Sequence, residues 1–141
     1  WSQQAFIKAS NTSQDDWFGF SIALSGDGNT LAVGAAAEAS SSSGLAGNQG
    51  DNAGGGAGAV YLFQRSGSTW GQRSYIKASN TDAGDTFGSS VALASDGMTL
   101  AVGAPAEGSL ATGIQGNQGD NSGSPDYTPG VRLGVGAVYL Y

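Results

Sequence analysis

Alternating apolar and polar residues predict short β-strands early in the chain. Every second residue from 18 to 24 is apolar, namely Phe18, Phe20, Ile22 and Leu24. This period of two is typical of a strand with one buried face. The same alternation predicts a strand at 31–35, and the Asp-Gly pair between the two runs is a strong hairpin signal.

Two further runs complete a unit of four predicted strands. Residues 1–9 end in a β-rich run before a polar turn, and 59–63 is apolar on both sides, as in a strand with both faces covered. A long loop rich in Gly, Ser and Asn spans about 37–58. No segment keeps a helical period over ten or more residues, so the predicted fold class is all-β.

The chain contains two copies of this unit. The run IKASNT at 7–12 returns at 76–81, TLAVGA at 30–35 returns at 99–104, and GNQGDN at 47–52 returns at 116–121. After an insertion at 125–133, the second copy rejoins the first, so that GAVYL at 136–140 corresponds to 58–62. We expect one repeat at 1–69 and a second at 70–141.

Four short antiparallel strands in a repeat are typical of a β-propeller blade. The spacing from Ile7 to Ile76 exceeds the ~40–50 residues of the commoner blades, and the long loop accounts for the excess. The chain starts at Trp1 and has its only Met at 98, so we expect a processed product or a segment of something longer.

Composition excludes several classes of function. The chain has no Cys and no His, which removes disulfides, thiolate metal sites and histidine-based catalysis. Five basic and 11 acidic residues give a net charge of -6 and no clustered basic face, so nucleic acid is not an expected partner. No apolar stretch approaches the ~18 residues of a membrane span. The 25 glycines among 141 residues fall mostly in turns and long loops.

The repeat resembles the FG-GAP repeat of integrin α-subunit propellers and bacterial surface proteins. Phe18-Gly19 and Phe87-Gly88 each precede an alternating strand, and Gly103-Ala104-Pro105 ends the next strand. Neither the Trp-Asp nor the Gly-His pair of WD-repeat blades occurs. The resemblance implies a propeller of four-stranded blades, two per chain, in a secreted or surface protein with an adhesion or ligand-binding role.

The calcium loop of FG-GAP repeats is not preserved. Only the central Asp-Gly of that loop remains, at Asp27 in the first copy and Asp96 in the second. Calcium takes six to eight oxygen ligands, so we expect both aspartates to serve the turn and no cofactor to be required. The remaining metal candidates are these two residues with Asp51 and Asp120.

The repeated GNQGDN loops are the main candidates for ligand binding. Side-chain bonds that hold the loop are the first interpretation. Contact with a carbohydrate or calcium is the alternative, because amides and a carboxylate cluster there: Asn48, Gln49 and Asn52, with Asn117, Gln118 and Asn121.

Several other residues have simpler expected roles. Asp16 and Asp85 should bond backbone groups where a strand begins, and the recurring aromatic residues should pack between blades. Lys8 and Lys77 should lay their stems over apolar surface. Trp17 has Thr86 as its counterpart and could be a contact surface, and the insertion adds Asp126, Tyr127 and Arg132.

The order of the strands within the two repeats predicts that copies of the chain assemble with one another. The second copy lacks a strand after Tyr141, while the first has a spare strand at 1–9. We expect that strand to complete the last blade of a neighbouring copy through Trp1, Phe6, Ile7, Val138 and Leu140. Three copies would give six blades and four would give eight, and we favour four. A fragment that aggregates outside a longer protein is the alternative.

The predicted function is a non-enzymatic propeller scaffold that assembles head-to-tail. A carbohydrate- or calcium-linked recognition module is the alternative. An enzyme is disfavoured because the polar residues are duplicated between the copies, whereas catalytic groups converge on one place.

Overall fold

The computed structural model describes residues 1–123 and 134–141, which are all-β and contain no helix. The predicted insertion at 125–133, with Asp126, Tyr127 and Arg132, lies outside the described residues. Strands within them are β1 (Phe18–Leu24), β2 (Thr30–Ala35), β3 (Ala59–Ser66), β4 (Thr69–Ile76), β5 (Ser90–Leu93), β6 (Leu100–Ala104) and β7 (Ala137–Leu140). In this part of the chain no helix is available to cross a membrane.

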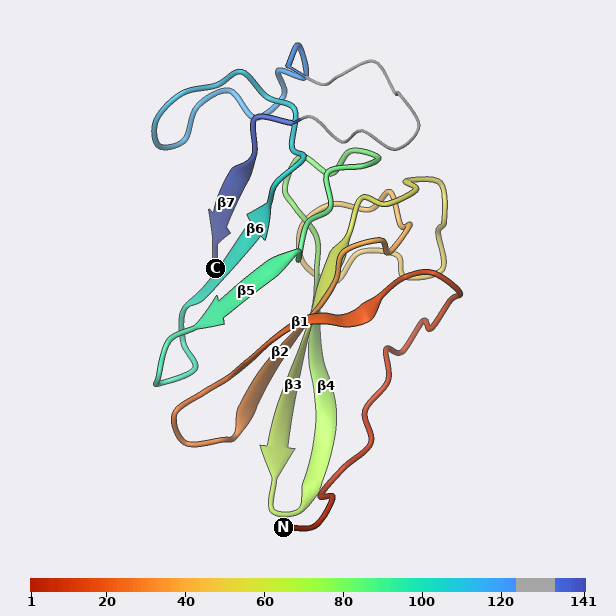
Figure 1. Cartoon of the computed structure of the whole chain (residues 1–141), viewed down its shortest axis with the longest axis vertical. Coiled ribbons are helices and arrows are strands. Elements are labelled where there is room, and N and C mark those ends of the chain that lie inside the picture. Colours follow the sequence, from red (N-terminus) through yellow and green to blue (C-terminus); the bar gives the residue numbers. More distant parts are fainter. Residues whose placement is uncertain (124–133) are drawn as a thin grey trace.

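The first sheet is antiparallel with the order β1-β2-β3-β4 (Figure 1). Its registers pair Ile22 with Val33 and Val33 with Tyr61 across neighbouring strands. The predicted strands at 18–24, 31–35 and 59–63 are confirmed, and the last of them extends to Ser66. Alternation in β1 and a mostly buried β3 match the two hydrophobic patterns of the sequence.

The fourth strand of the first sheet comes from the start of the second repeat. β4 pairs with β3, so that Ile76 lies opposite Val60 and Tyr75 opposite Tyr61. Residues 1–9, predicted as a strand, form none in this chain, and that prediction is wrong for the single chain. By the pattern of the repeat, such a strand pairs with a strand equivalent to β3, and β3 of this chain is already paired with β4.

The second sheet is antiparallel with the order β5-β6-β7 (Figure 1). Val102 of β6 pairs with Val91 and with Tyr139, the same arrangement as in β1-β2-β3. Within the described residues no strand pairs with the outer edge of β7. Val138 and Leu140 on β7 are each 72% exposed, although both are apolar.

The two sheets share one apolar core, the inter-sheet core. It joins Ala32, Val60 and Ile76 of the first sheet to Phe87, Leu100 and Val102 of the second repeat. A second group, the N-terminal cluster, lies on the opposite face of the first sheet and contains Val33, Tyr61, Phe63 and Tyr75. Ile7 and Ala9 pack against this cluster although their segment is not a strand.

Glycine at 58 allows the closest backbone approach between the two repeats. Gly58 has a φ of +83°, and a Cβ added there would lie 2.0 Å from the carbonyl oxygen of Phe87. The amides of Thr86 and Phe87 donate to the carbonyls of Gly56 and Ala57, at 3.1 and 3.0 Å. A residue without a side chain is therefore required where the two repeats meet.

Replacing Gly58 by Ala should destabilise the fold by at least about 2 kcal/mol, because the new Cβ both collides with backbone and strains φ. The measurement is the free energy of unfolding in urea. Gly55→Ala is the matched control, since nothing lies within 4 Å of its added Cβ, and it should change stability by less than about 1 kcal/mol. Equal stability of the two variants would contradict this account of the repeat junction.

Candidate functional site

The long loops of the two repeats have matching backbone conformations. Ala46 and Gln115, which occupy equivalent positions, both have a φ of +56°, an uncommon value for residues other than glycine. Gly58 and Gly136 donate their amides to the carbonyls of Glu38 and Glu107, at 2.9 and 3.0 Å. Each loop therefore returns to its sheet in the same way, and the two repeats can be compared residue by residue.

A buried ion pair lies under the loop of the first repeat. Lys77 Nζ donates to Glu38 Oε2 at 2.9 Å, and the side chains are 0% and 1% exposed. Glu38 also accepts from the amide of Ser40 and from Asn11 Nδ2, both at 3.1 Å. Burial lowers the pKa of Lys77, while the neighbouring Glu38 carboxylate acts in the opposite direction.

The sequence-based interpretation of Lys77 as a surface lysine is wrong. Its side chain is fully buried, because Glu38 supplies the opposite charge inside the protein. Lys8, its counterpart in the first repeat, is exposed. The same motif, IKASNT, therefore has an exposed lysine in the first repeat and a buried lysine in the second.

The first loop also adds backbone hydrogen bonds to the end of β4. Lys77 donates its amide to the carbonyl of Gly44 at 2.9 Å, and Gly44 donates to the carbonyl of Ala78 at 3.0 Å. Ala46 donates to the carbonyl of Tyr75 at 2.9 Å. The loop therefore pairs with the end of β4 through backbone hydrogen bonds.

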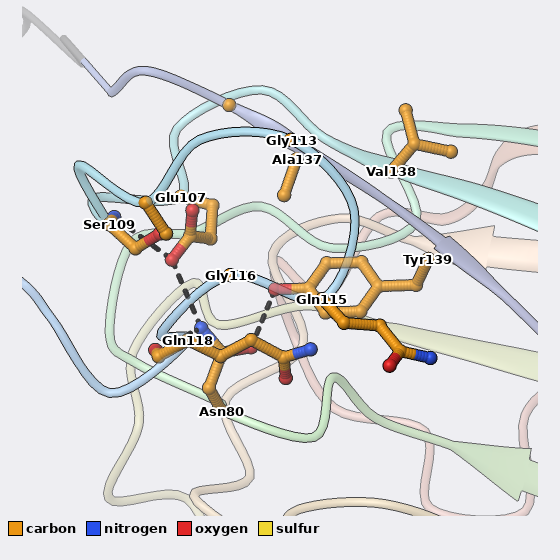
Figure 2. A pocket seen from close by; sticks show the side chains of 12 residues that line it. Asn80, Glu107, Ser109, Gly113, Gln115, Gly116, Gln118, Ala137, Val138 and Tyr139 are labelled. Atoms are coloured by element: carbon orange, nitrogen blue, oxygen red, sulfur yellow. Dashed lines mark hydrogen bonds between the residues drawn. The ribbon is translucent and has the colours of Figure 1, made fainter.

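The equivalent place in the second repeat is an open pocket of about 430 Å³. Figure 2 shows Glu107 at one side of it, with Asn80 and Tyr139 nearby. Glu107 is 2% exposed and accepts at Oε1 from Asn80 Nδ2 and from the amide of Ser109, both at 3.0 Å. Among the described residues, Oε2 of Glu107 accepts no hydrogen bond and no cation pairs with the carboxylate.

The aspartates of the two hairpin turns accept hydrogen bonds from residues of the same turn. Asp27 accepts from the Ser25 hydroxyl at 2.6 Å and from the amide of Asn29 at 3.0 Å, and these hydrogen bonds lower the pKa of Asp27. Asp96 accepts from the amide of Met98 at 2.9 Å. Both carboxylates thus hold the turn closed in the way that Asx turns do.

The amides of the GNQGDN loops also bond within the protein. Asn48 and Asn117 each accept from the amide two residues on, at 3.0 and 3.2 Å. Gln49 accepts from the Ser10 hydroxyl, and Gln118 accepts from that of Ser79. The segment that begins each repeat is therefore tied to the loop of the same repeat.

The acidic and terminal residues of these loops make similar contacts. Asp51 accepts from the amide and hydroxyl of Ser41, and Asp120 from the amide of Ser122, which lowers the pKa of each carboxyl. Asn121 donates to Asp82 at 2.9 Å, whereas the Asn52 side chain makes no hydrogen bond to another described residue. Within residues 1–123 and 134–141, no three acidic side chains group to hold a metal.

Asp16 and Asp85 bond the backbone at the start of a strand, as predicted. Asp16 accepts from the amide of Ser13 at 3.1 Å and Asp85 from that of Asp82 at 3.0 Å. Burial is the largest effect on both carboxyls, and it raises the pKa of Asp85 to about 7. Burial therefore makes the Asp85 carboxyl harder to ionise than an exposed aspartate.

The aromatic residues divide into two groups. Tyr61 and Tyr75 are buried in the first sheet, as expected for packing residues, and Tyr61 donates to Asn11 at 2.6 Å. Trp17 is 55% exposed and stacks on Phe20, while Phe6 is 81% exposed. Apart from Tyr141 at the end of the chain, the exposed aromatic side chains of the described residues lie on β1 and on the segments that precede it.

Sequence reasoning missed the two glutamates that organise the loops. Glu38 and Glu107 occupy the same position in the two repeats, just after the repeated TLAVGA run. Their recurrence in a chain of low charge was the available signal. It could not show that Glu38 would meet Lys77, because that depends on the strand pairing.

Comparison with known families bears out the resemblance. The profile of the FG-GAP repeat matches residues 1–63 and 70–125, so both predicted copies are recognised. FG-GAP repeats are propeller blades and are generally non-catalytic. No curated protein and no solved structure matches the chain.

Lys77→Met should lower the free energy of unfolding by about 3–5 kcal/mol, because it leaves the Glu38 carboxylate buried without its cation. Adding Glu38→Gln should restore most of the loss, since the remaining pair is uncharged. Urea denaturation measures both variants, with Arg73→Gln as the control that removes an exposed cation from β4, the strand that ends just before Lys77. If Lys77→Met proved as stable as Arg73→Gln, the ion pair would have no structural role.

The pKa of Asp85 predicts a pH dependence of stability. The folded protein holds this proton up to about pH 7, whereas an unfolded Asp releases it near 3.9. The contribution of Asp85 to stability therefore falls as pH rises from about 4 to 7. Asp85→Asn should remove that part of the slope in melting temperature against pH, and the turn variant Asp96→Asn should retain it. An unchanged slope in Asp85→Asn would refute the assignment.

Proposed function

Because the chain belongs to the FG-GAP repeat family, we propose that it is a non-catalytic propeller scaffold for adhesion or ligand binding, whose ring is completed by further copies of the chain. One observation carries this proposal. The two faces that are partly exposed at the ends of the two-sheet unit are the counterparts of the two faces that meet inside it.

The internal junction shows which residues meet. The first sheet contributes the face that carries Val60 and Leu62, which packs in the inter-sheet core. The second sheet contributes the face that carries Val91 and Leu93, which packs against the same core. This contact is the model for a junction between neighbouring blades.

The same two kinds of face are exposed at the ends of the unit. Val138 and Leu140, the counterparts of Val60 and Leu62, are each 72% exposed. Ile22 and Leu24, the counterparts of Val91 and Leu93, are 68% and 56% exposed. Contiguous apolar surface of this kind marks an interaction site. A second copy can cover it by repeating the internal junction.

Such a contact joins different surfaces of the two copies, so it is heterologous. Repeated from copy to copy, it gives a closed ring when the rotation between neighbouring copies divides a full turn evenly. Each chain contributes two blades, and propellers have typically 4–8 blades. We propose four copies with eight blades, in preference to three copies with six. The duplicated polar groups, which mostly hold turns and loops, support a scaffold role rather than catalysis.

The mass in solution tests the assembly directly. Multi-angle light scattering should give four times the mass of the chain across a range of protein concentrations. Three times the mass of the chain would still support a ring, with six blades instead of eight. A folded monomer would reject the assembly, and the family assignment would remain.

Ile22→Asp should dissociate the assembly to monomers, because it places a charge in the apolar junction. The folded content of each chain, read from circular dichroism, should not change, because Ile22 is exposed in the single chain. Met98→Asp is the control, since Met98 is 76% exposed in a hairpin turn outside both faces. Equal masses for the two variants would count against the proposed interface.

A further inference from the structure

We propose that the pocket beside Glu107 binds residues 1–9 of a second copy, and that Lys8 of that copy pairs with Glu107. The inference rests on the proposed assembly and identifies the site and register through which one copy recognises the next. It assigns a role to the buried carboxylate that has no cation among the described residues.

The first repeat provides the template for this site. There, β4 lies beside β3 and ends at the first residue of the run IKASNT, and the next residue, Lys77, is buried against Glu38. The same run occurs at 7–12, which makes Lys8 the counterpart of Lys77. Glu107 is the counterpart of Glu38. The chain therefore contains both halves of a second ion pair, but holds them apart.

The pocket also presents unused backbone groups for a strand. Gly44 and Ala46 donate their amides to the carbonyls of Ala78 and Tyr75, on either side of Lys77. Their counterparts Gly113 and Gln115 line the pocket, and their amides have no partner among the described residues. In the proposed complex these amides donate to the carbonyls of Ala9 and Phe6 of the second copy, and Lys8 donates its amide to Gly113.

The pairing of β3 with β4 fixes the register of the proposed complex. Val60 lies opposite Ile76 and Tyr61 opposite Tyr75. By correspondence, Val138 of one copy lies opposite Ile7 of the next, and Tyr139 lies opposite Phe6. Phe6 is 81% exposed in the single chain. Docking would cover it together with the exposed edge of β7.

The segment 1–9 already lies where such a contact needs it. Ile7 and Ala9 pack against the N-terminal cluster of their own chain. Their counterparts Ile76 and Ala78 pack in the inter-sheet core, next to the second sheet. Residues 1–9 therefore lie on the first sheet much as the end of β4 lies on the second.

The residues that follow the segment anchor it to their own repeat. Asn11 donates to Glu38, just as Asn80 donates to Glu107. At the internal junction Lys77 bonds Glu38 of one repeat while Asn80, three residues on, bonds Glu107 of the next. Lys8 and Asn11 would divide between two copies in the same way.

Charge makes the pocket selective for this segment. A buried carboxylate without a cation is costly, so an incoming lysine relieves that cost as it docks. Removing one partner of a buried, hydrogen-bonded charge pair at an interface typically weakens binding strongly. Other extended segments could pair with the edge of β7, but one without a cation at this position would leave Glu107 unpaired.

The first experiment compares the self-association of Lys8→Met with that of Arg73→Gln, which removes one exposed positive charge and installs the residue found at position 4. Analytical ultracentrifugation should show at least about 30-fold weaker association for Lys8→Met. Arg73→Gln should associate like the unchanged protein. Because Lys8 is exposed in the single chain, its loss should leave the fold of each chain intact.

A double-mutant cycle separates pairing from other effects. Glu107→Gln keeps the oxygen that accepts from Asn80 and Ser109, and it should also weaken association. The variant with both Lys8→Met and Glu107→Gln should associate more strongly than the two separate losses would predict. Additive losses would show that Lys8 and Glu107 do not meet.

The register is tested by disulfide formation, since the chain has no native cysteine. Ile7→Cys with Val138→Cys should give covalent oligomers on a non-reducing gel after mild oxidation. Gln3→Cys with Val138→Cys, which lies out of register, should give far fewer. Equal yields from the two pairs would overturn the register.

The outcomes distinguish this inference from the proposed function. If the unchanged protein is a monomer, both fail. If it is oligomeric but Lys8→Met associates like Arg73→Gln, the assembly stands and the Lys8–Glu107 pairing is wrong.

Discussion

The buried pair of Lys77 and Glu38 is the contact on which the arrangement of the two repeats depends. It lies where the last strand of the first sheet ends and where the second repeat continues towards its own loop. A lysine can remain buried there because the carboxylate faces it at 2.9 Å and because backbone bonds to Gly44 hold the surrounding loop. This contact therefore ties the long loop to the end of the outer strand, while the inter-sheet core joins the neighbouring sheet.

The repeated polar residues hold the turns and long loops in their conformations in both copies. Aspartates close the hairpin turns, and Asn48 and Asn117 shape the long loops, while Ser10 and Ser79 tie each loop to the start of its repeat. Polar groups used in this way are satisfied within the protein, which is what a scaffold with long, glycine-rich loops needs. Among the described residues, the groups without such partners include the Tyr75 hydroxyl in the first sheet and the backbone amides of Gly113 and Gln115 beside Glu107.

Much of the fold could be predicted from the sequence, because the alternation in β1 and the exact return of IKASNT and TLAVGA are local signals. The match to the FG-GAP repeat bears out the family on those same residues. The fate of residues 1–9 could not be predicted for the single chain, because it depends on which strands pair, and both edges of β3 are taken by β2 and β4. Lys77 was misjudged for a related reason, since a lysine at a strand end looks exposed until its buried carboxylate is found.

The hairpin between β3 and β4 crosses the boundary between the two repeats, since β4 begins at Thr69 and the second family match begins at residue 70. A cut at that boundary would separate a sheet from its own outer strand. A single repeat of this sequence is therefore not a unit of folding, even though it is a unit of duplication. In a longer array of such repeats, each added repeat would supply the outer strand of the preceding sheet. Successive sheets would then be joined both by the covalent chain and by the pairing of strands.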